Sequence, residues 1–189
     1  MERHLLIQKI GEWIQNIKIM KIKSFMLMTM TAVALVFGVS SCGGDDDVPP
    51  VPESPVADLL AGSYSGTETM TVSGDIDESE KVFQFTKAND TTVDLVIPAY
   101  GEGMMTLPEL PVKGIMLVKE VDDIAGALPQ GSYTGTVKNA KGEEKTYVVS
   151  DFMVLYSGKD NAIMVTFKLK YGNMPFDFDG VFTGKKLLK

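Results

Sequence analysis

The stretch Gly62-Ser-Tyr-Ser-Gly-Thr-Glu-Thr-Met-Thr-Val72 decides the fold class of this 189-residue chain. Tyr64, Met70 and Val72 lie on one face of an extended strand, and serine and threonine residues occupy the other face. Successive side chains of a strand point to opposite sides of a sheet, so this alternation predicts a strand with one buried face.

The same two-residue period recurs along the chain. Ile163, Val165, Phe167 and Leu169 alternate with polar residues within Ala162–Lys170, which predicts a second strand of this kind. Further strands are expected near residues 81–86, 91–97, 112–119, 144–156 and 176–183, and short helices only at Val56–Ala61 and Val121–Leu128. The pattern therefore predicts an all-β domain.

An internal repeat suggests how the strands are arranged. Gly62-Ser-Tyr-Ser-Gly-Thr67 recurs 69 residues later as Gly131-Ser-Tyr-Thr-Gly-Thr136, and at the same offset Met105 matches Met174. The repeat predicts two similar halves of about four strands each. Closing a sheet removes its exposed edges, so we expect a single antiparallel β-barrel of eight to ten strands.

Several short motifs resemble a known family. The opening Gly62-x-Tyr64-x-Gly66 and the later Met174-Pro-Phe176 and Phe182-x-Gly184 resemble the calycin-like β-barrel domain of bacterial lipoproteins. The resemblance covers about residues 60–186. It implies a single lipocalin-like barrel, a lipid anchor and no established activity. Tyr64 stands where the lipocalins proper have tryptophan.

The N-terminal region predicts export and anchoring. Lys21 and Lys23 precede an apolar run of about 15 residues, which fits a secretory signal and is shorter than a membrane span. Val39-Ser40-Ser41-Cys42 resembles the lipobox of bacterial lipoproteins, which implies cleavage between Ser41 and Cys42 and diacylation of the Cys42 thiol. We expect translation to start at Met20; a longer leader starting at Met1 is the alternative.

Three segments follow from these features. Residues 1–41 are the signal region, residues 42–55 are the lipidated cysteine with an acidic and proline-rich tether, and residues 56–189 are the barrel domain. The acidic run after Cys42 resembles an export tag for the outer face of the outer membrane, so we expect an outer-membrane lipoprotein at the cell surface. The periplasmic face is the alternative.

The composition of the mature chain excludes several functions. Removal of residues 1–41 leaves 13 basic and 23 acidic residues, and no histidine, arginine or tryptophan. Such a charge repels nucleic acid. Without histidine or a cysteine besides Cys42, the chain lacks Ser-His and Cys-His nucleophile pairs and the usual zinc ligands. We therefore expect a protein that is not an enzyme and holds no cofactor or metal.

Two groups of carboxylates are candidate sites. Asp75, Asp77, Glu78 and Glu80 could supply oxygens to calcium, but they lack the glycine and spacing of an EF-hand and are typical of a solvated turn. Asp177 and Asp179 share one face at strand spacing, as a glycosidase pair would, or simply make that face soluble.

Soft apolar side chains form the candidate ligand site. Methionine and tyrosine adapt to irregular apolar ligands, and a barrel of eight strands can hold one small molecule. The candidate lining residues are Tyr64, Met70, Met105, Tyr133, Met164 and Met174. The leading hypothesis is a module that binds a small apolar molecule or a glycan, with protein partners unknown. The alternatives are a structural or adhesive protein with a filled barrel and, third, a carboxylate-dependent hydrolase.

Overall fold

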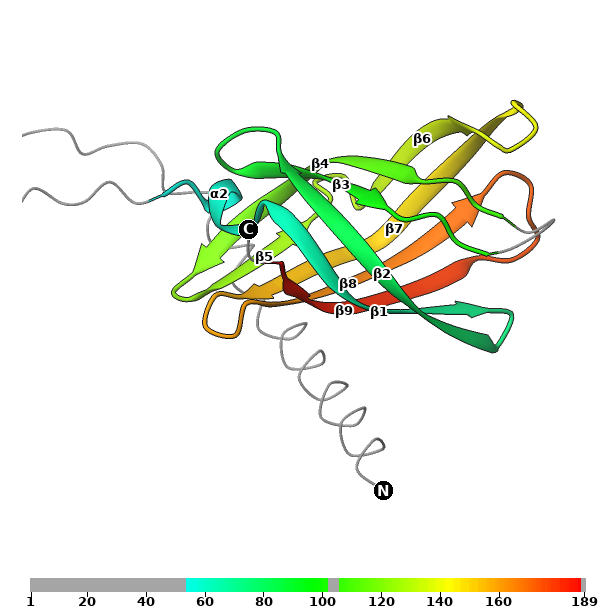
Figure 1. Ribbon diagram of the computed structural model, residues 1–189. Coiled ribbons are helices and arrows are strands. Elements are labelled where there is room, and N and C mark those ends of the chain that lie inside the picture. Colours follow the sequence, from blue (N-terminus) through cyan, green and yellow to red (C-terminus); the bar gives the residue numbers. More distant parts are fainter. Residues whose placement is uncertain (1–53, 102–105, 188–189) are drawn as a thin grey trace, which may run out of the picture. The chain divides into compact units, whose positions relative to one another are not determined.

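One helical turn and nine strands make up the described part of the chain, residues 54–101 and 106–187 of a computed structural model (Figure 1). In chain order the elements are α2 (Val56–Leu60), β1 (Gly62–Val72), β2 (Asp75–Lys87), β3 (Thr92–Ile97), β4 (Leu110–Glu120), β5 (Asp123–Ala127), β6 (Ser132–Lys138), β7 (Glu144–Ser157), β8 (Ala162–Tyr171) and β9 (Phe178–Lys186). No helix in these two ranges is long and apolar enough to cross a bilayer. The signal region, Cys42, nearly all of the tether and Met105 lie outside the described residues.

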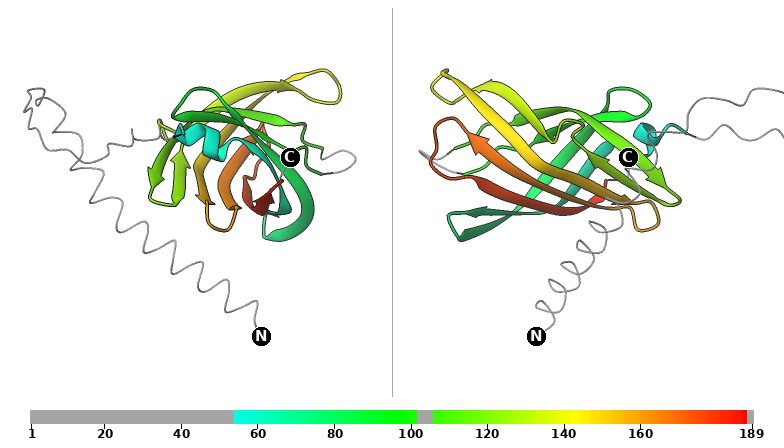
Figure 2. Two further views of the ribbon diagram at one scale, coloured as in Figure 1. Left: turned by 60° about the vertical axis from the view of Figure 1, so that its left-hand side comes forward. Right: turned by 180° about the vertical axis from the view of Figure 1, so that it is seen from behind.

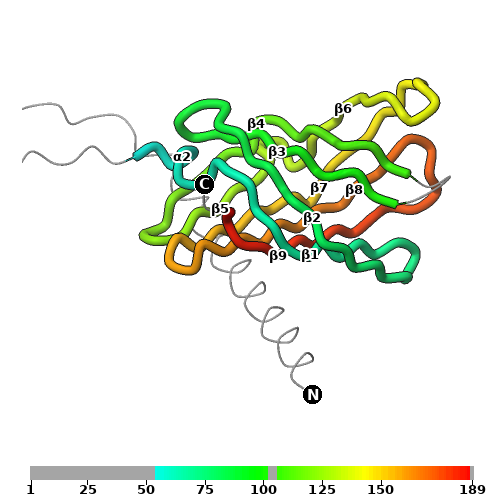
Figure 3. Tube along the Cα trace, in the orientation of Figure 1, coloured from blue at the N-terminus to red at the C-terminus, as the bar shows by residue number. Residues whose placement is uncertain are grey.

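Eight of the strands form a closed antiparallel barrel. Backbone pairing runs in the order β5-β4-β3-β2-β1-β9-β8-β7, and β5 pairs with β7 to complete the ring. Consecutive strands are neighbours through most of the ring, as the tube in Figure 3 shows. The predicted all-β class and antiparallel barrel are confirmed, with eight strands in the ring and β6 as one additional strand.

β5 and β6 together follow one edge of β7. β5 pairs with residues 153–157 of β7, and β6 pairs with residues 144–150, both antiparallel. Pro129 and Gly131, whose φ is +76°, lie in the interruption between them. The register of β7 shifts at the same place, where Asp151 adopts a φ of +49°. The chain thus uses one broken strand where a regular barrel would use a continuous one.

The break makes the two halves of the chain unequal. The first Gly-Ser-Tyr motif lies in β1, which pairs on both sides with β2 and β9. The second lies in β6, which pairs with β7 outside the ring. The repeat therefore marks the beginnings of two strands, β1 and β6, but these two strands do not occupy equivalent positions in the barrel.

The helix expected at Val121–Leu128 is wrong, because β5 occupies this segment. Asp123–Ala127 forms backbone pairs with β4 on one side and β7 on the other. A Cβ atom at Gly126 would collide with the side chains of Leu117 and Val154, so glycine allows the close approach of these neighbours. Pairing on two sides outweighs the short local helical pattern. The helix expected at Val56–Ala61 is confirmed as α2.

The barrel has two different ends (Figure 2). α2 lies at one end, beside the β2–β3 turn, where the Ala57 amide donates to the Asp90 carbonyl over 3.2 Å. We call this the closed end. The β6–β7 turn at residues 139–143 and the β8–β9 loop at residues 172–177 lie at the other end, which we call the far end.

Candidate functional site

α2 closes its end of the barrel with apolar side chains. Ala57 and Leu60 are fully buried. The Tyr64 hydroxyl donates to the Leu60 carbonyl over 2.6 Å, and the Lys186 amine donates to the Leu59 carbonyl over the same distance. Burial raises the pKa of Tyr64 and lowers that of Lys186. These contacts fix α2 as a plug and leave the far end as the place where a ligand could enter.

Aromatic rings fill the middle of the barrel. The Phe83 and Phe182 rings stack with their centroids 4.1 Å apart, and the Tyr64 ring meets Phe85 and Tyr156 edge to face. The backbone of Gly180 leaves the space that the Phe167 ring occupies. The candidates Tyr64 and Met70 are buried in this core, where they pack against other side chains. The filled core favours a ligand site at the far end over one at the barrel centre.

Among residues 54–101 and 106–187, Glu68 is the ionisable carboxylic acid that the barrel buries. It lies on the inward series of β1 with Tyr64 and Met70, and only 1% of its surface is exposed. Neither carboxylate oxygen has a hydrogen-bond partner. Burial raises the pKa of the Glu68 carboxyl to about 7; the charge of Lys81 lowers this pKa in part, and that of Asp77 raises it further. A carboxyl group in this position is largely shielded from water and can accept or, when protonated, donate a hydrogen bond.

Polar neighbours of Glu68 are engaged elsewhere. The Lys81 amine donates to the Ala99 carbonyl over 2.8 Å. Burial raises the pKa of Tyr100, and the nearby Asp77 carboxylate raises it further. Lys81 thus offsets the charge of Glu68 at a distance without satisfying its oxygens. The group is an interior acid without a partner.

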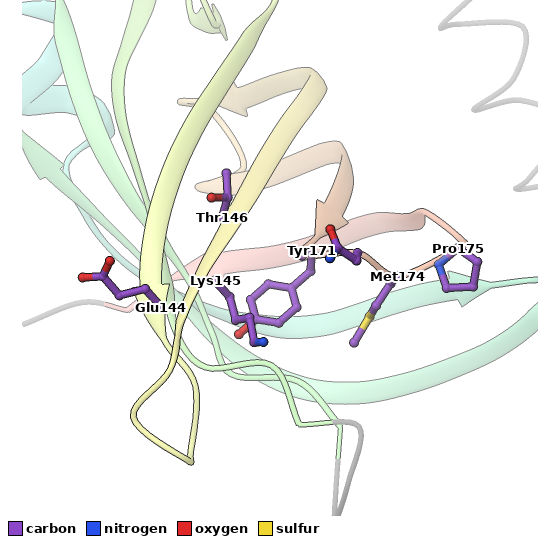
Figure 4. Close-up of a pocket in the computed structure, with 8 residues that line it drawn as sticks. Glu144, Lys145, Thr146, Tyr171, Met174 and Pro175 are labelled. Carbon is purple, nitrogen blue, oxygen red and sulfur yellow. The ribbon is translucent and has the colours of Figure 1, made fainter.

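A cleft of about 580 Å³ opens at the far end (Figure 4). It lies between the start of β7 and the β8–β9 loop. Its lining residues are Glu144, Lys145, Thr146, Tyr171, Gly172, Asn173, Met174 and Pro175. Apolar surface from methionine and proline thus adjoins hydroxyl, amide, ammonium and carboxylate groups. This mixture suits a ligand that is apolar on one side and carries hydrogen-bonding groups on the other.

Tyr171 is the buried polar residue of the cleft. It ends β8, is 5% exposed, and its hydroxyl is buried without a hydrogen-bond partner. Burial raises the pKa of Tyr171, and the nearby Lys145 ammonium opposes this in part. Gly172, at a φ of +56°, turns the chain directly after it, and its amide donates to the Thr146 carbonyl over 2.8 Å. The loop is thereby held against β7, and the unpartnered Tyr171 hydroxyl lies enclosed at the wall of the cleft.

The six predicted lining residues do not form one site. Met174 lines the cleft, while Tyr64 and Met70 belong to the core. Tyr133 is half-buried on β6, with its ring centroid 6.2 Å from that of Tyr147, and Met105 is not among the described residues.

Met164 points away from the interior. Ile163 and Val165, which flank it on β8, are both core residues, so alternation places Met164 on the outer face. Met164 therefore does not face the barrel interior with Tyr64 and Met70.

The carboxylate groups considered from the sequence lie on the surface. Asp75, Asp77 and Glu78 are exposed near the start of β2, and Glu80 accepts a hydrogen bond from Thr67 over 2.8 Å. No three metal-ligating side chains gather within residues 54–101 and 106–187. Asp177 and Asp179 are exposed beside the start of β9. Neither Glu68 nor Tyr171 was predicted as a site residue, although each continues a series of inward-facing positions that the sequence alternation defines.

Comparisons with known proteins give the fold only. No protein-family model and no curated protein matches the chain. Among solved structures, it is similar to a "putative outer membrane protein" from Bacteroides fragilis, with a TM-score of 0.52 at 17% sequence identity. The match covers 70% of this chain and 53% of that one, so the chain spans about half the length of this neighbour. At this identity the likeness establishes a shared barrel architecture.

Proposed function

We propose that this protein is a lipid-anchored component of the cell envelope that binds a small amphiphilic molecule at the far end of its barrel and catalyses no reaction. The observation that carries the proposal is the unpartnered, buried hydroxyl of Tyr171 in the cleft. An unsatisfied buried polar group costs stability, and a ligand group that pairs with it recovers this cost. The ligand therefore has a hydroxyl or carbonyl group for Tyr171 and an apolar portion for Met174 and Pro175.

The location in the envelope rests on the lipobox-like Val39-Ser40-Ser41-Cys42 and agrees with the description of the structural neighbour as an outer-membrane protein. Two acyl chains on Cys42 hold a protein to a bilayer far more firmly than one. The acidic stretch after Cys42 favours the cell surface. Replacement of Cys42 by alanine should move the protein from the membrane fraction to the soluble fraction. Retention in the membrane would contradict the anchor.

The absence of catalysis is part of the proposal. The mature chain has no histidine or arginine. Asp177 and Asp179 are exposed, and Glu68 is enclosed by the core. These positions favour binding over hydrolysis.

A second candidate is an accessory role with a filled barrel. The stacked Phe83 and Phe182 rings in the barrel interior favour it, because a packed centre needs no ligand to be stable. The two candidates differ at the cleft: binding requires the Tyr171 hydroxyl, while an accessory role does not.

A pair of hydroxyl deletions tests the binding function. We would measure unfolding temperatures of the mature protein with lipid and oligosaccharide fractions extracted from its host's envelope. A fraction that holds the ligand should raise the wild-type midpoint by several degrees, since a ligand that binds only the folded state stabilises it. Tyr171→Phe should lose this rise, and its unliganded stability should equal or exceed that of the wild type, because the variant removes a buried hydroxyl that has no protein partner.

Tyr156→Phe is the matched control. Its hydroxyl donates to Asn161 over 3.0 Å, away from the cleft residues. This variant should lose about 1 kcal/mol of stability and keep the response to the ligand. An equal response from wild type and Tyr171→Phe would reject the cleft as the binding site.

A further inference from the structure

The outer surface of the barrel carries an apolar area on one side. Backbone register aligns Val118, Ala125, Leu155 and Met164 in one row across β4, β5, β7 and β8. The adjacent row contains Met116 and Met153, with one polar position at Thr166. We call these six apolar residues, Met116, Val118, Ala125, Met153, Leu155 and Met164, the outer apolar face.

This face differs from the outer surface of β1. Met116 and Val118 are 51% and 53% exposed. The outward positions of β1, by contrast, are serine and threonine throughout. Contiguous exposed apolar area of this kind marks an interaction surface more often than scattered single residues do.

The turn between β4 and β5 extends the same surface with an unusual residue. Val121 is 87% exposed and has a φ of +52°. A β-branched residue rarely adopts this left-handed conformation, which glycine or asparagine tolerates better. Exposure and backbone strain both disfavour valine here, and an apolar surface outside the domain would offset these costs.

The position of the turn indicates what that surface is. The β4–β5 turn and α2 lie at the same end of the barrel, both in Figure 1 and in the view from behind in Figure 2. The tether enters at this closed end, directly before α2. Cys42 and Pro55 are separated by 13 residue steps, which span at most about 45 Å when fully extended. An anchor at Cys42 would thus keep a bilayer within reach of the closed end.

We propose that Val121 and the outer apolar face rest on the surface of a zwitterionic phospholipid bilayer. The proposal rests on the lipid anchor of the proposed function. The acidic mature chain is not attracted to anionic headgroups, so the contact is hydrophobic and secondary to the acyl chains. A bilayer is soft and can deform around the convex side of the barrel. A second copy would present another convex side, which fits the first less well. In this orientation the cleft lies at the end of the barrel opposite the Val121 turn.

A single tryptophan can test the contact, because the mature chain has none. The lipidated Val121→Trp protein would be placed on phosphatidylcholine vesicles in which some acyl chains carry bromine, a quencher of indole fluorescence. Lys141→Trp, in the exposed β6–β7 turn at the far end, is the matched control. We expect at least a twofold loss of emission at position 121 and none at position 141. If the turn variant fails to fold, Val118→Trp reports from the same face.

The outcomes separate the contact from the anchor. Protein that floats with the vesicles but shows no quenching at position 121, or equal quenching at both positions, overturns the contact and leaves the anchor intact. Protein that does not float overturns both. A doubled mass in solution, with the indole at position 121 shielded from iodide before vesicles are added, assigns the face to a second copy and also overturns the contact.

Discussion

Glu68 places a carboxyl group in the interior of the barrel, where neither oxygen has a hydrogen-bond partner. Its cross-strand neighbours are Ser79 on β2 and Phe182 on β9. An unpaired charge in such surroundings weakens the fold, and the protein reduces the cost by protonating the group. Residues that break the rules of a stable core are most common where a protein binds something.

The stability of the protein should therefore fall as pH rises through the titration of Glu68. The pKa of this carboxyl is raised from 4.5 to about 7 in the folded state. Folding then favours the protonated form, so the full stability is present below pH 4.5 and is lost as pH rises toward and through 7. A shift of this size corresponds to about 3 kcal/mol. Glu68→Gln should remove this loss, as measured by urea denaturation at pH 5 and pH 8.

Glu78→Gln serves as the control, because Glu78 is exposed on the neighbouring strand β2. It should keep the pH dependence of the wild type. If both variants follow the wild-type curve, Glu68 ionises at little cost and water reaches its carboxyl group.

Sequence alternation predicts that the Glu68 side chain points into the barrel, but it does not predict what surrounds that side chain. Tyr64, Glu68 and Met70 are separated by even numbers, so one inward series includes all three. That Lys81 turns to the Ala99 carbonyl instead of Glu68 depends on a loop contact that no local pattern encodes. The inward direction of Tyr171 is predictable in the same way, and its lack of a partner is not.

At the scale of elements, local patterns predict strands well and the broken strand poorly. The expected strand at 144–156 matches β7 within one residue, and that at 162–170 matches β8 equally well. β5 was not predicted as a strand, because Asp123–Ala127 has only five residues and its strand character comes from pairing with β4 and β7. The candidate site is harder to predict than the strands. The methionines and tyrosines that meet depend on which strands become neighbours, and local patterns do not encode this.

α2 offers a direct test of the closed end. Leu60, the last residue of α2, is fully buried, and its carbonyl accepts a hydrogen bond from the Tyr64 hydroxyl. Leu60→Ala should cost about 2–5 kcal/mol of unfolding free energy, since it leaves a cavity in a packed core. Leu59→Ala is the matched control: Leu59 is only partly buried, so its loss should cost clearly less. Equal and small effects would show that α2 does not seal the barrel.

At the scale of the whole molecule, the two ends of the barrel take different roles. The closed end receives the tether and carries the strained Val121 turn, while the far end holds the cleft. The resemblance to calycin-like domains correctly implies a single antiparallel barrel. The ring of eight strands is, however, filled by aromatic side chains at its middle. The proposed ligand site therefore lies at the rim of a filled barrel.

Native mass spectrometry of the mature lipoprotein, extracted gently from its host's envelope, tests this assignment most directly. We predict a reproducible adduct of a single small molecule, which disappears in Tyr171→Phe and persists in Tyr156→Phe. A bare protein mass from every preparation, or an adduct that is indifferent to Tyr171, would contradict binding at the cleft and favour the accessory role.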